Sequence, residues 1–445
     1  MKILTSWRER YRQVEGILAI TIVFLKLRVL FATWGKPQGF DCPSWLEMFR
    51  LVRWFEPLPP PLTGGGNYHP PLSHLIGRLI YAVYPHEVEA SQVASTLALL
   101  IAFFAMRALL LRIGVLYTVS GFWILYGGFS LPLFVFLAVE TTYDSWVLAW
   151  FMLVFLCSVV SFWIVAPKTW WKSPRYSVGL LLLGSTLALG MLNKYSGLIA
   201  FSLPFLTIFS RRGLRAVFRE ISAPLFAITI GVMLASPLYY QRYYKAEGHW
   251  MPTAMDFQLT DRLVYERAKR DAAPVDFVAK MLRVPLAPRE DEHTPVMDSF
   301  VDLTWFHTWK KDSWLGEQPP LSMAISQVYS KAFAWLSLSG AAYFCIRHRQ
   351  ILARFRHFGL ILVAVACLYS ASALCFAWKY PVWDWRVFKT KYMSAAALCI
   401  VYLASVPFQD GCFYRRHSIF VRAIEETAFF SLLAFMFINH LVPVY

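Results

Sequence analysis

Apolar residues fill long blocks along most of the chain, and most of the charge lies in the stretches between these blocks. The blocks run to about 16–24 residues, the length that crosses ~30 Å of hydrocarbon as a helix. Helices satisfy their own backbone hydrogen bonds, so they can lie in lipid. The pattern predicts an all-α, polytopic integral membrane protein with about 11 transmembrane helices. The predicted spans are 16–33, 88–111, 115–138, 145–166, 177–192, 196–209, 221–240, 320–346, 358–376, 392–406 and 423–440.

The connection between the first two predicted spans is polar, aromatic and rich in proline and glycine. Residues 45–55 combine apolar and charged positions at helical spacing, which predicts an amphipathic helix in the membrane interface. The proline-rich run 57–61 ends that helix, and the glycines at 64–66 allow a bend. Residues 75–84 are too few to span, which predicts a half-helix at the surface. We expect 34–87 to be an external, periplasmic loop that carries these juxtamembrane helices.

Basic residues are concentrated in every second connection between the predicted spans. Because lysine and arginine accumulate on the cytoplasmic side, this alternation predicts a cytoplasmic N-terminus and an external C-terminus. The first apolar block has no A-x-A cleavage site after it, so we expect a retained first helix. The chain is expected to divide into a membrane module at 1–240, one large external loop with short helices at 241–319, and C-terminal transmembrane helices at 320–445.

The composition is typical of an integral membrane protein, and it restricts the kinds of partner that the chain can bind. Apolar residues make up 58% of the chain and charged residues 16%, whereas soluble proteins carry about a quarter charged residues. The net charge of +16 lies mostly in the inner connections, which favours membrane lipids with anionic headgroups as partners. No nucleic-acid-binding motif accompanies this charge, so nucleic acid is excluded. The seven cysteines form no CxxC pair and indicate no disulfide framework.

Two acidic residues stand close to the predicted external ends of spans. Asp41 comes after the first span, and Asp144 directly precedes the fourth. A carboxylate held partly out of water has a raised proton affinity and can act as a general base. We therefore take Asp41 and Asp144 as candidate catalytic residues, and Glu140 in the same connection as a candidate for acceptor binding. The alternative for each is an interfacial anchor without chemistry.

Several cations lie on the predicted external side, against the positive-inside bias, and four of them are singled out. An anionic ligand at this face would account for them, and a lipid-linked phosphate is the natural candidate in a membrane. The alternative is that their long side chains extend to lipid headgroups. The candidate phosphate-binding residues are Lys194, Arg386, Lys389 and Lys391, together with His69.

The stretch 68–72, YHPPL, is the most specific short motif. Its prolines predict an extended entry into the half-helix and hold His69 beside the loop acids. His69 can orient a phosphate, relay a proton or bind a metal, or it can belong to a structural His-Pro turn. Tyr68 and His307 are candidates for acceptor or loop contacts. A divalent metal has weak support, with His69, His293 and His307 as candidates, because no HExxH or similarly close spacing occurs.

The order of these motifs resembles that of the GT-C superfamily, the glycosyltransferases that use polyprenyl-phosphate sugars. The most similar branch is that of the protein O-mannosyltransferases and aminoarabinose transferases. The similarity covers 10–240, with a weaker echo at 378–406, and implies that 1–240 is a GT-C-like catalytic module. The family's acid–lysine pair before PPL is Tyr68-His69 here. The matching features are Asp41, the helix at 45–55, HPPL at 69–72, Asp144, the step at 193–197 and Lys391-Tyr392.

The resemblance implies an enzyme, an inverting glycosyltransferase that acts at the outer face of the membrane. Lys194 would hold the donor phosphate with help from Lys391 or Arg386. Asp41 would take the proton from an acceptor hydroxyl that attacks the anomeric carbon, and Asp144 would orient the acceptor or the base. The implied partners are a polyprenyl-phosphate sugar, such as one on undecaprenyl phosphate, and a glycan, lipid or protein acceptor. The implied location is a bacterial inner membrane, with the active site facing the periplasm; the endoplasmic reticulum is the alternative.

Other functions for such a chain are a transporter or flippase of a lipid-linked or anionic substrate, a lipid-phosphate phosphatase or ligase, and a membrane scaffold. A transporter would need ionisable or polar groups within its spans, and residues such as Gln327 and Lys331 are few. No internal repeat of the kind found in many transporters occurs. The large one-sided loop also suits an enzyme better, so the transporter or flippase remains the alternative to the glycosyltransferase.

Overall fold

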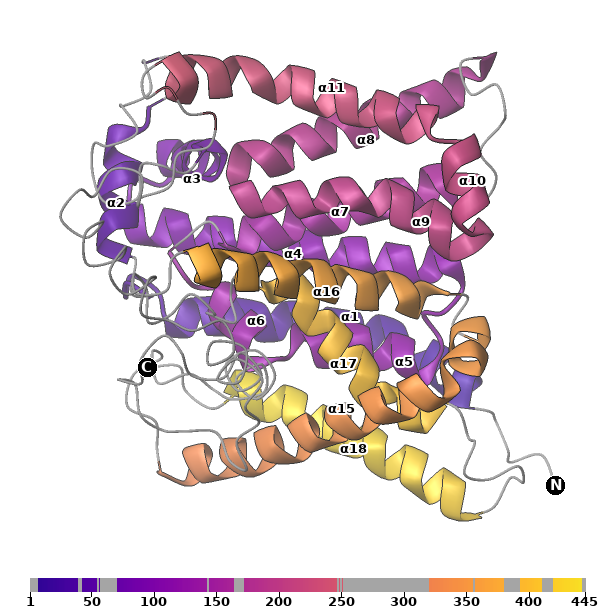
Figure 1. Cartoon of the computed structure of the whole chain (residues 1–445). Helices are drawn as coiled ribbons and strands as arrows, with labels where there is room; N and C mark the ends of the chain where they lie inside the picture. The colour runs from indigo at the N-terminus through magenta and orange to yellow at the C-terminus, as the bar shows by residue number, and fades with distance from the viewer. Residues whose placement is uncertain are drawn as a thin grey trace.

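Figure 1 shows a computed structural model of the chain, which is built from helices packed against one another. All regular secondary structure among the residues that it describes is helical, as the sequence predicts. The described residues are 7–38, 42–53, 56, 70–141, 144–163, 172–245, 248, 250, 320–354, 357–379, 393–409 and 419–441.

The helices of the N-terminal part follow the predicted order. They are α1 (Trp7–Ala32), α2 (Cys42–Leu51), α3 (Leu72–Val83), α4 (Glu87–Ile113), α5 (Val119–Phe122), the π-helical turn η1 (Trp123–Gly127), α6 (Pro132–Leu137), α7 (Asp144–Phe162), α8 (Pro174–Asn193), the 3-10 helix η3 (Tyr195–Ser202), α9 (Leu203–Arg212), α10 (Leu214–Arg219), α11 (Ser222–Tyr239) and the π-helical turn η4 (Tyr240–Tyr244). The C-terminal helices are α15 (Pro320–Arg354), α16 (Phe358–Lys379), α17 (Ser394–Gln409) and α18 (Ile419–Leu441).

Each of the eleven predicted spans overlaps one or more of these helices. Over the described residues, five helices are long and apolar enough to cross a membrane, judged by length and composition. The count of about 11 transmembrane helices therefore stays a prediction. The five helices are Glu87–Ile113, Asp144–Phe162, Pro174–Asn193, Ser222–Tyr244 and Phe358–Cys375.

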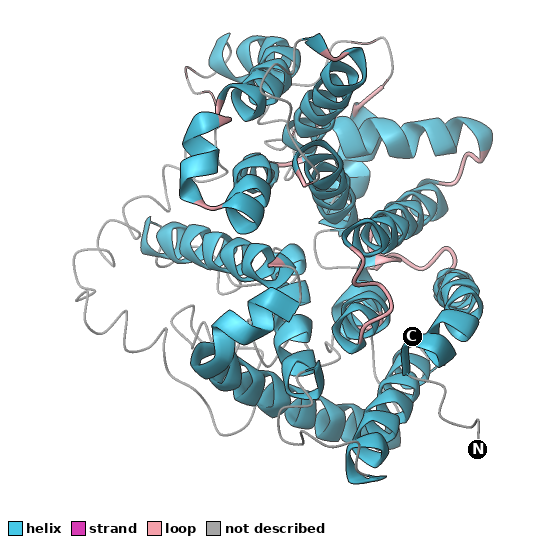
Figure 2. Ribbon diagram, turned by 90° about the vertical axis from the view of Figure 1, so that its right-hand side faces the viewer, coloured by secondary structure: helices cyan, strands magenta, loops and turns pink. Residues whose placement is uncertain are grey.

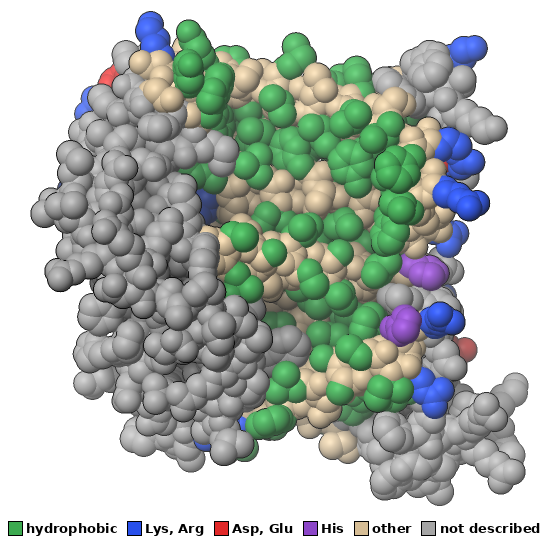
Figure 3. Space-filling model, in the orientation of Figure 1, with side chains coloured by type: hydrophobic (Ala, Val, Ile, Leu, Met, Phe, Trp, Pro, Cys, Tyr) green, Lys and Arg blue, Asp and Glu red, His purple; other side chains and the backbone are tan. Residues whose placement is uncertain are grey.

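The surface has the pattern of an integral membrane protein. On the face shown in Figure 3, apolar side chains cover the middle of the helices, and Lys, Arg and His side chains gather at the right-hand edge. This edge is where α9 and α10 lie in Figure 1, and Arg211, Arg212 and Arg219 stand in the last turns of these two helices. The side of the membrane that this edge faces stays a prediction.

Both juxtamembrane helices predicted in the first connection are present, but each begins three residues earlier than predicted: α2 at Cys42 instead of 45, and α3 at Leu72 instead of 75. Proline explains the shift, because it is compatible with the first turn of a helix, where its missing N–H is not needed. Pro43 is the second residue of α2, and Pro71 caps α3.

The third predicted span, 115–138, is not one continuous helix. It is divided into α5, η1 and α6, and the π-helical turn ends at Gly127. The helix continues through Gly127 and Gly128, and it is interrupted at residues 130–131, just before Pro132 begins α6. A Cβ on Gly128 would lie 2.8 Å from Leu398 Cδ2. The pair therefore lets α17 approach this segment closely.

Helices α4, α7, α8 and α11 run alongside one another between two opposite ends of the molecule (Figure 1). One end holds α2, α3, the start of α4 and α7, and the end of α8 and α11; we call it the α2–α3 end. The opposite end holds α9 and α10, and Figure 2 views the molecule from that side. Within the bundle, α7 packs against α4 and α8, and α8 packs against α11.

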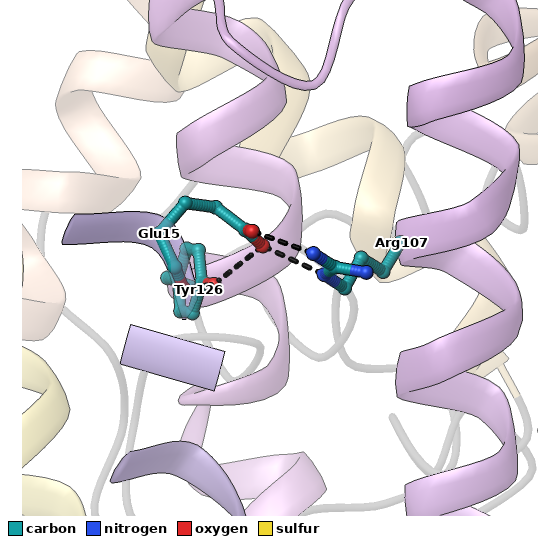
Figure 4. Close-up of polar contacts among 3 residues, drawn as sticks. All are labelled: Glu15, Arg107 and Tyr126. Atoms are coloured by element: carbon teal, nitrogen blue, oxygen red, sulfur yellow. Dashed lines mark hydrogen bonds and ion pairs between the residues drawn. The ribbon is translucent and has the colours of Figure 1, made fainter. Parts of the chain in front are cut away.

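A buried polar network joins α1, α4 and η1 (Figure 4). Arg107 donates through Nε to Glu15 Oε1 at 2.7 Å and through Nη2 to Oε2 at 2.6 Å. The hydroxyl of Tyr126 donates to Glu15 Oε1 at 3.1 Å. Because the Glu15 side chain is buried, these bonds replace the water that its carboxylate loses on folding.

We expect Arg107→Ala to destabilise the protein strongly, because it leaves the buried Glu15 carboxylate without its cation. Breaking one partner of a fully buried ion pair costs about 3–5 kcal/mol, and the 32% exposure of the Arg107 side chain places the expected cost below that range. The measurement is thermal unfolding of the purified protein in detergent. Arg53→Ala is the control, since it removes an exposed pair with Glu56 that is worth at most about 1 kcal/mol. Equal melting temperatures for the two variants would contradict a stabilising network.

Candidate functional site

An ion pair joins the ends of α7 and α8 at the α2–α3 end. Asp144 is the first residue of α7, and Lys194 directly follows α8. Lys194 Nζ donates to Asp144 Oδ1 at 2.7 Å, and only 11% of the lysine side chain and 3% of the aspartate side chain are exposed. A buried charge without a partner is costly, so the contact lowers the cost of burying these two side chains. The structure thus brings together two residues that the sequence singles out separately.

The local backbone directs these two side chains toward each other. Lys194 is extended, with φ −161° and ψ 149°, so the chain leaves α8 abruptly and turns back as η3. Gly197 permits this close return, because a Cβ there would lie 2.4 Å from the carbonyl oxygen of Gly190. Asp144 stands at the N-terminus of α7, where the helix dipole favours a carboxylate.

The connection that leads into α7 is fastened to the beginning of the first loop. The backbone N–H and the hydroxyl of Thr141 both donate to the carbonyl oxygen of Gln38, at 3.2 and 3.0 Å. Burial raises the pKa of the Cys42 thiol, Glu140 raises it further, and a hydrogen bond with Thr141 lowers it. Glu140 is itself buried. Residues on both sides of 39–41 therefore lie against the connection that precedes α7.

A second cation lies among tyrosines at the same end. Arg242 belongs to η4, which continues α11, and only 6% of this residue is exposed. Its guanidinium lies over the ring of Tyr243, 5.4 Å from the centroid. That ring is 6.3 Å from the ring of Tyr195, the residue after Lys194. Single π-helical turns are frequent at functional sites. This turn places Arg242 in a cluster with Tyr243 and Tyr195, next to the ion pair.

His74 on α3 is the neighbour of this cluster. Its ring stacks on the ring of Trp45, with centroids 3.8 Å apart and an angle of 25° between the planes. The residue is 1% exposed, and neither ring nitrogen has a hydrogen-bond partner in the described part of the chain. Burial, and then the charge of Arg242, lowers the pKa of His74 to about 3. The imidazole is therefore neutral at physiological pH.

Most other predicted site residues lie outside the described residues, and their roles stay predictions. These residues are Asp41, Tyr68, His69, His293, His307, Arg386, Lys389 and Lys391. In the part of the chain that the structure describes, no group of three His, Cys, Asp or Glu residues could hold a metal ion. The candidate metal ligands are all among the residues just named, so a metal also stays a prediction.

Arg242 and His74 are not singled out by the sequence. Arg242 could have been found by the reasoning that finds Lys194, because it is a cation just beyond the predicted outer end of the seventh span. His74 gives no such signal, since a lone histidine in a short apolar helix is more often a packed core residue. Its burial without hydrogen-bond partners follows only from how α2, α3 and η4 come together.

Comparison with known proteins finds no matching family model and no matching curated protein. Among solved structures, the archaeal oligosaccharyltransferase AglB from Archaeoglobus fulgidus, in complex with an inhibitory peptide and a dolichol-phosphate, has a TM-score of 0.49 and 14% identity. The match covers 99% of this chain but only 56% of that one. ArnT from Cupriavidus metallidurans, bound to undecaprenyl phosphate, has a TM-score of 0.40 and 12% identity, covering 90% of this chain and 79% of that one. At these values the likeness says nothing about activity, which has to follow from the side chains of this chain.

We expect acid to destabilise the wild-type protein more steeply than a His74→Gln variant. The pKa of His74 is about 3 in the folded chain and about 6.5 when the residue is exposed. Between these two pKa values the unfolded chain binds a proton that the folded chain does not. The contribution of the neutral His74 to the free energy of unfolding is therefore complete above pH ~6.5 and is lost as the pH falls toward ~3. Melting temperatures from pH 7 to pH 4 test this. If the melting temperatures of the two proteins fall equally with decreasing pH, His74 does not have a lowered pKa in the folded protein.

Proposed function

We propose that this chain is a GT-C-type glycosyltransferase that moves a sugar from a polyprenyl-phosphate donor to an acceptor hydroxyl at the outer face of the membrane. The observation that carries the proposal is the buried Asp144–Lys194 pair, with Arg242 nearby at the same end of membrane-length helices. Cations suit the donor phosphate, and a carboxylate suits the acceptor hydroxyl. The motif order in the sequence supports the same transfer chemistry.

Lys194 and Arg242 are the proposed phosphate ligands. Arginine offers phosphate a planar fork of donors, and lysine adds a compact charge. Both residues stand at the ends of helices, α8 and α11, that have exposed apolar side chains such as Leu182 and Met233. A lipid tail can lie along such side chains in the hydrocarbon while its phosphate stays at the helix ends. This arrangement favours a lipid-linked phosphate over a water-soluble one.

The proposed reaction is a single displacement. The acceptor oxygen attacks the anomeric carbon as the bond from that carbon to the phosphate oxygen breaks, so the configuration inverts and the lipid phosphate leaves. Asp41 takes the proton of the acceptor hydroxyl, and Asp144 orients the acceptor. When the donor phosphate shares the charge of Lys194, the carboxylate of Asp144 becomes a better hydrogen-bond acceptor for the incoming hydroxyl. Glu140 is a further candidate for acceptor contacts.

Transfer itself is tested by incubating the purified protein with radiolabelled polyprenyl-phosphate sugars and candidate acceptors. We expect label on an acceptor, and we expect Asp41→Asn to lower the rate about 10²–10⁴-fold, the usual worth of a general base. Glu56→Gln is the control, because Glu56 is an exposed acid that pairs only loosely with Arg53. If Asp41→Asn transfers sugar at the wild-type rate, Asp41 is not the general base. Uptake of the sugar lipid into vesicles without transfer would favour the transporter or flippase.

Arg242→Gln and Lys194→Gln are expected to weaken donor binding more than turnover. A hydrogen bond to a charged group contributes about 1.5–3 kcal/mol, which corresponds to roughly a 10–100-fold rise in the donor KM. Steady-state kinetics with the sugar donor measures this. Arg53→Gln is the matched control, because this exposed arginine lies just beyond α2 at the same end of the molecule. An unchanged donor KM in both site variants would remove these residues from the phosphate site.

A further inference from the structure

His74 has hydrogen-bonding capacity that the described part of the chain does not meet. The residue is 1% exposed, and neither Nδ1 nor Nε2 has a hydrogen-bond partner there. Buried polar groups nearly always have a partner, and an exception in a native structure calls for a ligand, a water or a functional role. A neutral imidazole offers one donor and one acceptor. The residue is therefore suited to bind a polar group that enters the site.

The surroundings of His74 indicate the charge of that group. The stack on Trp45 covers one face of the ring and fixes its plane, so hydrogen bonds have to form at the ring edge. Arg242 is close enough for its charge to act on His74. A positive charge beside an imidazole opposes protonation, so two cations would repel each other here. An anion that contacts both side chains removes that repulsion.

Other charged groups on the described elements around α3 do not shift the pKa of His74. Arg50 on α2 pairs with Glu87 on α4 at 2.8 Å, and Lys194 after α8 pairs with Asp144. Arg78 on α3 lies over the ring of Tyr81, 4.5 Å from its centroid. Arg242 is the charged group among the described residues that shifts the pKa of His74. The remaining titratable groups on α2, α3, α4 and α8 are Cys42, Glu47, Tyr81, Glu89, Arg107, Arg112, Arg175 and Tyr176.

We propose that His74 binds the same phosphate group as Arg242 and gains a proton as that phosphate arrives. The proton comes from solvent and goes to a ring nitrogen, which then donates to a phosphate oxygen. This inference rests on the proposed function and adds a residue to its donor site. The imidazolium also stabilises the negative charge that builds up on the phosphate when the bond to the anomeric carbon breaks.

The consequence is that donor binding is linked to pH. In the free protein the pKa of His74 is about 3, and a bound phosphate raises it because opposite charges attract. Between the two pKa values, binding takes up close to one proton per site, so affinity falls by up to about tenfold for each unit of rising pH. A histidine that only packs against Trp45 has no such effect.

Isothermal titration calorimetry with undecaprenyl phosphate tests this link, at pH 6 and at pH 7.5, in two buffers of different ionisation enthalpy. The buffer difference gives the number of protons taken up. We expect wild-type protein to take up about one more proton at pH 6 than His74→Gln, and to show the larger loss of affinity at pH 7.5. The subtraction removes the lipid phosphate's own ionisation, which both proteins share. His74→Phe keeps a stacked ring and serves if His74→Gln folds poorly.

Equal proton uptake and equal affinity in wild type and both His74 variants would overturn the inference while leaving the proposed function intact. Failure of the wild-type protein to bind undecaprenyl phosphate would instead remove the proposed function and this inference together. Inorganic phosphate is the comparison ligand. If it binds as tightly as the lipid and with the same extra proton, His74 is confirmed as a phosphate ligand and the lipid-linked donor is contradicted.

Discussion

The buried ion pair between Asp144 and Lys194 is the constraint on which the α2–α3 end depends. Neither side chain is stable there alone, because an unpaired charge with so little exposed surface would lose its hydration without compensation. The pair holds the first residue of α7 against the residue that follows α8. Since α8 also packs against α11, the same contact helps to fix the position of η4 and Arg242. The ion pair and the packing of α8 on α11 therefore hold both cations at the same end of the molecule.

The helices were predictable from the sequence because each apolar block encodes its own helix. The predicted span 88–111 is α4, Glu87–Ile113, and the predicted span 221–240 is α11 continued by η4. Local chemistry also explains the deviations. Prolines stand at the starts of α2 and α3, and Pro132 begins α6 after the interruption in the third predicted span. Such features depend on a few neighbouring residues, so a single sequence contains the information.

The site was predictable only in part, because its contacts join residues far apart in the chain. Charge placement singled out Asp144 and Lys194, but their 2.7 Å contact spans 50 residues and depends on how α7 packs against α8. His74 could not be found, since its character comes from Trp45 and Arg242, which lie on other elements. The same imidazole on an exposed helix would titrate near neutrality.

Burial, together with the charge of Arg242, explains why the imidazole of His74 is neutral. Asp144, Lys194, Arg242 and a neutral His74 together carry a single net positive charge. Three cations without a carboxylate would be costly to bury and would hold any anion from solution. Under the proposed function and the inference drawn from it, Lys194 would share its existing charge with the donor phosphate, and His74 would gain a proton only when that phosphate enters. The proposed site would then attract the donor more strongly once the donor is present, and the protein without donor would not have to bury the additional charge.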